Sequence, residues 1–225
     1  MTLQPASPRA LLAETLGTAL LLAGVVGSGI MGERLAQGND AVALLANAVA
    51  TGALLVVLIW MLGPVSGAHF NPLVSAVMAR LGRMTWRTCA LFIACQVIGA
   101  MLGVMLAHAM FDLPLLQTGI KVRTGASQWL AEAVAAFGLL LTILGVARHR
   151  PEAVAASVGL YITAAYWFTA STSFANPAVT LARAFTTSFA GLRPEDVLGF
   201  AAAQIIGAAL AVPIARALGF LDKPE

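Results

Sequence analysis

Two short segments, His69-Phe-Asn-Pro-Leu-Val-Ser75 and Phe174-Ala-Asn-Pro-Ala-Val-Thr180, decide how this chain folds. Each places Asn-Pro ahead of small or apolar residues, within apolar stretches (66–80 and 174–185) that are too short to cross a bilayer. Proline suits the first turn of a helix and asparagine is a favoured N-cap, so each Asn-Pro predicts a helix start. At about 1.5 Å per residue, such a helix reaches roughly halfway across a membrane. The segments therefore predict two re-entrant half-helices.

The composition around these segments is that of a membrane protein. Of 225 residues, 60% are hydrophobic and only 10% are charged, unlike a soluble domain. The net charge of +3 comes from residues scattered singly between apolar blocks. We therefore expect the lipid bilayer, and not nucleic acid, as the partner of this chain. Six blocks reach roughly the 20 residues of a spanning helix. They are 10–31, 41–62, 86–110, 129–147, 153–170 and 197–219, which predicts an all-α membrane protein.

The sequence flanking the two Asn-Pro segments repeats. Ala13-Glu opens the first half and Ala131-Glu the second, while Gln96-Val-Ile-Gly-Ala follows the first Asn-Pro and Gln204-Ile-Ile-Gly-Ala the second. We therefore divide the single domain, 1–225, into two halves, 1–115 and 126–225. Each half holds three spans and one half-helix. Because three is an odd number, the second half is inverted relative to the first.

Six spans place both termini on one side of the membrane, and the basic residues indicate which side. With cytoplasmic termini, the inside holds Arg9, Arg80, Arg83, Arg87, Arg148, Arg150, Arg216 and Lys223, and the outside holds Arg34, Lys121, Arg123, Arg183 and Arg193. Cytoplasmic loops carry an excess of Lys and Arg. The sequence therefore predicts a multi-pass protein of the cell (inner) membrane with cytoplasmic termini.

Half-helices that begin at the membrane centre imply a pore. Non-helical backbone at that depth is tolerated only where it is buried in protein or lines a water-filled cavity. The two helix N-termini each contribute about half a positive charge, a barrier to protons and cations. We expect Asn71 and Asn176 to keep their side-chain amides free to donate hydrogen bonds to a passing solute.

The paired Asn-Pro segments, Ser66-Gly-Ala-His-Phe-Asn-Pro, the Ala-Glu openings and the Gln-x-x-Gly-Ala repeats resemble the aquaporin and aquaglyceroporin (major intrinsic protein) family. The resemblance spans the whole chain. It implies the aquaporin fold and a passive channel for small neutral solutes, assembled as a homotetramer. It implies no enzyme activity, no cofactor and no metal site.

The departures from the family pattern concern the selectivity filter. Where the family has Arg directly after the second Asn-Pro-Ala, this chain has Val179, and the first Asn-Pro is followed by Leu73 in place of Ala. Thr51 stands where the family often has Phe or Trp. In the fifth span the filter residue is Ile162 if the alignment has a gap, or Ala164 without one. This filter lacks an aromatic and a cation, so we expect it to be wider and less polar.

Arg183 lies four residues beyond Val179, on the same helix face and one turn nearer the outside. Its guanidinium is a candidate to reach back from the vestibule toward the filter. The alternative is that the side chain extends to the membrane interface, as many terminal Arg side chains do.

The remaining polar residues have structural roles in the resemblance. It makes Glu14 and Glu132 acceptors that hold the re-entrant loops, and Gln96 and Gln204 groups that bond the loop backbone. The His69 side chain braces its loop. A ladder of backbone carbonyls lines the pore, from Gly67, Ala68, His69, Thr172, Ser173 and Phe174.

The Asn-Pro-Ala-Val segment resembles the arsenic-linked bacterial aquaglyceroporins. The leading prediction is a passive channel for glycerol-type solutes and arsenite or methylated arsenicals, and water is a further candidate solute. One alternative is a strict water channel. Another is a cation-coupled transporter, since inverted repeats with broken helices build those too. An intramembrane hydrolase using Ser66 and His69 is disfavoured because the second loop, Ser173-Phe-Ala-Asn-Pro, lacks the His.

Overall fold

The structure is a computed structural model that describes residues 6–222. Over this range it is all-helical, as the composition predicts. The α-helices are α1 (Pro8–Leu35), α2 (Asp40–Ser66), α3 (Pro72–Arg80), α4 (Trp86–Met110), α5 (Ala126–His149), α6 (Val154–Phe168), α7 (Pro177–Arg183) and α8 (Val197–Ala217), with the 3-10 turns η1 (Pro151–Ala153) and η2 (Pro194–Asp196).

Five of the six predicted spans are long helices. Among the described residues, α1, α2, α4, α5 and α8 are long and apolar enough to cross a membrane. The fifth predicted span, 153–170, is shorter than the sequence indicates, because α6 has 15 residues and follows the turn η1. At about 1.5 Å per residue, α6 alone extends roughly 22 Å. It packs between α2 and α5.

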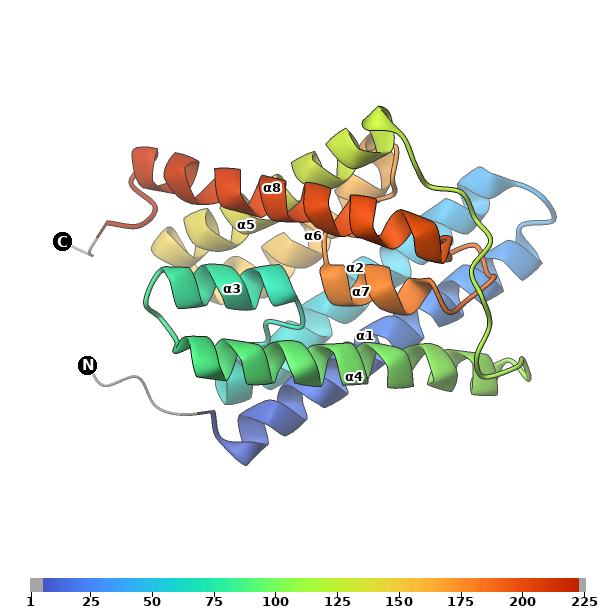
Figure 1. The fold of residues 1–225 in the computed structure, drawn as a ribbon, viewed down its shortest axis with the longest axis horizontal. Helices are drawn as coiled ribbons and strands as arrows, with labels where there is room; N and C mark the ends of the chain where they lie inside the picture. Colours follow the sequence, from blue (N-terminus) through green and yellow to red (C-terminus); the bar gives the residue numbers. More distant parts are fainter. Residues whose placement is uncertain (1–5, 223–225) are drawn as a thin grey trace.

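The two predicted half-helices are present, and each begins at its proline. The side chain of Asn71 caps α3 by accepting a hydrogen bond from Leu73 N at 2.9 Å, and Asn176 caps α7 through Ala178 N at 3.0 Å. Figure 1 shows α3 and α7 starting near the middle of the bundle and running in opposite directions. This is the arrangement expected of an inverted repeat.

The two ends of the described chain lie at one end of the bundle, as an even number of spans predicts. The start of α1 and the end of α8 lie at the same end of the molecule, together with the turn between α3 and α4 (Figure 1). Lys223, which the charge count includes, lies outside the described residues. The segment 111–125 crosses the opposite end of the bundle, where α7 ends.

Candidate pore

A cavity of about 250 Å³ lies between the half-helices and the helices α1, α2, α5 and α6. Asn71, Asn176, Thr51 and Val179 line it. Ile162 lines it too, whereas Ala164 is exposed on another side of α6. The sequence left open whether Ile162 or Ala164 faces the pore. The orientation of α6 turns Ile162 toward the cavity.

The two Asn side chains join the re-entrant loops at the centre of the molecule. Asn71 Nδ2 donates to the carbonyl of Ala175, and Asn176 Nδ2 donates to the carbonyl of Phe70, both at 2.8 Å. This corrects the expectation that both amides remain free. Each amide carries two N–H groups, of which one holds the opposite loop and the other has no partner among residues 6–222.

Glu14 and Glu132 are completely buried and hold the two loops in the same way. Glu14 accepts hydrogen bonds from His69 N at 3.0 Å and Phe70 N at 2.8 Å. Glu132 accepts from the backbone N–H groups of Phe174 at 2.8 Å and Ala175 at 2.9 Å. Each carboxylate thereby satisfies two backbone donors that the bilayer interior could not.

The glutamines support these carboxylates. Gln96 Nε2 donates to Glu14 at 2.8 Å and to the Ser75 hydroxyl at 3.0 Å. Gln204 Nε2 donates to Glu132 at 2.6 Å and to the hydroxyl of Thr180 at 2.8 Å. The expectation that they bond the loop backbone is therefore wrong. They link the carboxylates to the half-helices.

The loop backbone ahead of each half-helix is left with open acceptors. Ala68, Phe70, Thr172, Ser173 and Ala175 have positive φ angles between 47° and 62°. Within residues 6–222, no hydrogen bond reaches the carbonyls of the predicted ladder, at Gly67, Ala68, His69, Thr172, Ser173 and Phe174. Five of these six residues line the cavity, and Thr172 lines a second pocket.

His69 also borders the cavity, but its ring is held by the protein. Nδ1 lies 3.0 Å from the Ser75 hydroxyl, and the ring meets Phe92 edge-on at 5.4 Å. The Ser66 hydroxyl donates to Glu14 at 2.6 Å, not to His69. These contacts agree with a bracing role, and the Ser66–His69 pair that the hydrolase alternative requires is not formed.

Arg183 ends α7 and is buried, with 1% of its side chain exposed. Its guanidinium carbon lies 3.4 Å above the ring centroid of Phe174, and its Nε donates to the carbonyl of Ala190. The side chain lines the cavity. It is therefore directed into the protein rather than extended to the membrane interface.

Two residues of this region, Tyr166 in the cavity wall and Arg123 behind it, were not predicted from the sequence as site residues. Tyr166 is buried, lines the cavity, and places its hydroxyl 3.3 Å from that of Thr51. It follows Ile162 by four residues, a helical spacing that could have revealed it. Arg123 donates to the carbonyls of Ser171 at 2.9 Å and Gly191 at 3.0 Å. It lies in an irregular segment whose path no periodicity predicts.

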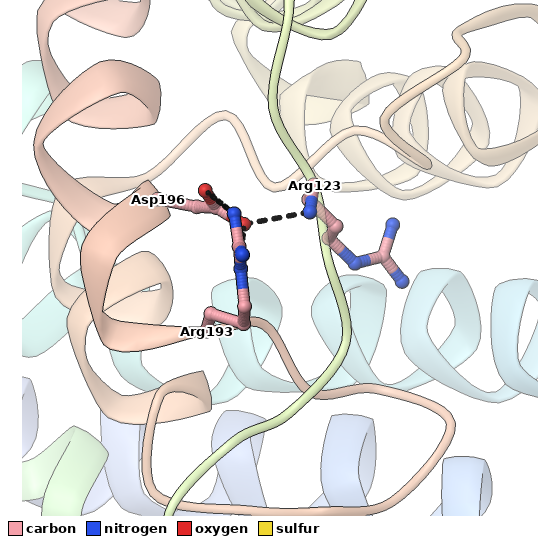
Figure 2. Close-up of polar contacts among 3 residues, drawn as sticks. All are labelled: Arg123, Arg193 and Asp196. Atoms are coloured by element: carbon pink, nitrogen blue, oxygen red, sulfur yellow. Dashed lines mark hydrogen bonds and ion pairs between the residues drawn. The ribbon is translucent and has the colours of Figure 1, made fainter.

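Arg123 is anchored through its backbone to the start of α8. Its N–H donates to Asp196 Oδ2 at 2.7 Å, and Asp196 also forms a salt bridge with Arg193 at 2.9 Å. Figure 2 shows the Arg123 guanidinium pointing away from this carboxylate. Burial lowers the pKa of Arg123 to about 10, so the guanidinium stays charged at neutral pH.

The end of the cavity at which α7 ends therefore carries positive charge. In the part of the chain that the structure describes, the one salt bridge joins Arg193 and Asp196. The guanidinium groups of Arg123 and Arg183 are thus not neutralised by ion pairs. Buried positive charges of this kind disfavour the entry of cations.

A multi-pass helical bundle, with two half-helices that meet at a central cavity, is a membrane channel for small solutes. Comparison with known proteins agrees, because residues 2–170 match the sequence profile described as major intrinsic protein. This chain belongs to the major intrinsic protein family.

The relatives extend the match along the chain. The chain is 61% identical over 208 residues to aquaglyceroporin AqpS of Rhizobium meliloti (strain 1021), covering 92% of this chain and 89% of that protein. It is 31% identical over 157 residues to the probable aquaporin NIP4-2 of Arabidopsis thaliana, covering 68% of this chain and 54% of that protein. The predicted family and the passive small-solute channel are confirmed.

A solved structure shares the fold. The aquaglyceroporin from Plasmodium falciparum matches with a TM-score of 0.73, over 92% of this chain and 94% of that chain, at 18% identity. At that identity the likeness concerns the fold alone. It confirms the prediction of the aquaporin fold.

Proposed function

We propose that this channel passes small uncharged solutes larger than water, namely glycerol-type solutes and arsenite or methylated arsenicals, and that water also passes. The observation that carries the proposal is Val179, which lines the cavity directly after Asn-Pro-Ala, where the family pattern has Arg. Thr51 and Ile162 line the same cavity without aromatic bulk. Arsenite at neutral pH is an uncharged trihydroxy acid similar in size to glycerol.

Passage through such a pore requires replacement of the hydrogen bonds that a solute gives up on leaving water. The second N–H of Asn71 and that of Asn176 supply donors at the centre. The open carbonyls of the two loops supply acceptors on either side. Hydroxyl-bearing solutes match both sets, and transport needs no bound cofactor.

Val179→Arg tests the filter assignment. The added guanidinium narrows the pore, and a barrier higher by about 1.4 kcal/mol slows passage about tenfold. We expect glycerol and arsenite permeability in proteoliposomes to fall by at least that factor while water permeability changes less. Val179→Ile controls for the substitution itself. Undiminished glycerol and arsenite flux through folded Val179→Arg protein contradicts the assignment.

The contacts of the two buried carboxylates weigh against a cation-coupled transporter, which needs midplane carboxylates that face its substrate. Glu14 and Glu132 are instead occupied by backbone N–H groups and glutamines. A proton-dependent flux that Glu14→Gln abolishes would favour the transporter. A flux measurement in which water passes but glycerol and arsenite do not would favour the strict water channel.

We also propose a homotetramer in the cell (inner) membrane, with cytoplasmic termini and with repeat halves 1–115 and 126–225. The duplicated Asn, Glu and Gln contacts of the two loops support the division into halves. The family resemblance supports the tetramer. The mass of the detergent-solubilised complex, corrected for bound detergent, tests the assembly.

A further inference from the structure

Three polar side chains from different helices form one wall at the outer end of the cavity. They are Thr51 of α2, Tyr166 of α6 and Arg183 of α7, and all three line the cavity. The Thr51 and Tyr166 hydroxyls lie 3.3 Å apart, and the Arg183 side chain lines the same cavity. The opposing residues Val179 and Ile162 are aliphatic. The wall thus supplies the polar groups at this level.

One donor of Arg183 is left unused by the protein. Its Nη1 is buried and, among residues 6–222, has no hydrogen-bond partner. A buried donor without a partner costs about 1–3 kcal/mol. The side chain lines the cavity, so a solute or water that reaches this nitrogen would relieve that cost.

We propose that Thr51, Tyr166 and Arg183 form the solute-selecting wall of this pore, with Arg183 one helical turn beyond Val179 on α7. The solutes it selects are small and carry hydroxyl or acid oxygens that accept from Arg183 and exchange hydrogen bonds with the two hydroxyls. This inference rests on the proposed function, because it assigns selection within that pore.

Arg123 is the positioning residue of this wall. Its guanidinium bonds the backbone before α7 at Ser171 and after it at Gly191. It also lies 5.1 Å from the centroid of Phe174, whose ring carries Arg183. Because Arg123 is fixed through Asp196 (Figure 2), the two ends of the α7 segment and the ring beneath Arg183 are held together.

Tyr166→Phe tests the wall with little change in volume. The readout is the ratio of glycerol to water permeability in one proteoliposome preparation, which does not depend on the fraction of folded channel. We expect the ratio of glycerol to water permeability to fall about fivefold, which corresponds to the loss of one hydrogen bond. Glycerol is affected more than water because it must replace several hydrogen bonds to water at once. The matched control is Tyr161→Phe, whose hydroxyl bonds Ala135 O on α5 and does not line the cavity.

Arg183→Lys and Arg123→Lys complete the test, because lysine keeps the charge but loses the planar fork. Both are expected to lower the same ratio. If all permeabilities fall in proportion, or if Tyr166→Phe behaves as Tyr161→Phe does, the wall assignment is overturned. Wild-type protein that passes no glycerol overturns the proposed function instead, so the two failures are distinguishable.

Discussion

At the residue scale, the re-entrant loops depend on two buried carboxylates. Glu14 accepts hydrogen bonds from Ser66, His69, Phe70 and Gln96. A buried charge is costly unless it is fully hydrogen-bonded. Here these four donors meet that requirement, and they are themselves shielded from water. The carboxylates and the loops therefore stabilise one another, and neither is left with a charge free to bind a cation.

Glu132→Gln should lower stability. The amide puts an NH₂ group beside backbone N–H donors of Phe174 and Ala175, and a lost charge-assisted hydrogen bond costs about 2 kcal/mol. Thermal unfolding in detergent should show a lower midpoint. Glu152→Gln, at an exposed site, serves as the control. Equal midpoints for the two variants would show that Glu132 does not hold the loop.

Single residues were predictable from the sequence where their roles are local. Asn71 and Asn176 were found because a cap must sit beside its own helix. Tyr166 was missed although helical spacing from Ile162 pointed to it. Arg123 could not be found, because its partners lie 48 and 68 residues away along the chain and are brought together only by the folded segment 111–125.

At the scale of elements, the cavity wall depends on how closely α2 and α6 approach. A Cβ added to Gly52 would lie 2.7 Å from the carbonyl oxygen of Gly159, and one added to Gly159 would lie 2.5 Å from that of Gly52. Real side chains do not fit at such distances. The two glycines thus bring Thr51 on α2 next to Tyr166 on α6.

Gly159→Leu should push these helices apart. Overpacking of a tight contact costs about 1–3 kcal/mol or more, so we expect a lower unfolding midpoint and a smaller yield of folded protein on size-exclusion chromatography. Gly63→Leu is the matched control, since a side chain there meets open space. If Gly159→Leu is as stable as Gly63→Leu, the close contact does not matter.

The elements themselves were largely predictable, because length and hydropathy report a membrane span directly. The five long helices and the two half-helices appear where the sequence places them. The exception is α6, which stops at Phe168. Residues 169–170 are apolar enough to extend it, but the chain turns there into the loop that Glu132 holds. Hydropathy does not report such a tertiary constraint.

At the scale of the whole molecule, orientation is the testable consequence of the charge distribution. We expect Thr118→Cys, in the segment over the outer end, to react with a membrane-impermeant thiol reagent added to intact cells. Glu152→Cys, at the other end, should react only after the cells are permeabilised. Cys89 is buried and Cys95 half-buried, so the unsubstituted protein gives the background. The opposite pattern of labelling would reverse the proposed topology.

We propose a pore whose filter, lacking Arg at position 179, admits solutes larger than water. The most direct measurement is stopped-flow light scattering on proteoliposomes, comparing water, glycerol and arsenite permeability in one preparation with empty liposomes. We predict that glycerol and arsenite enter well above the empty-liposome rate. If water alone enters faster than the control, the channel stands but the wide filter and the arsenical solute are contradicted.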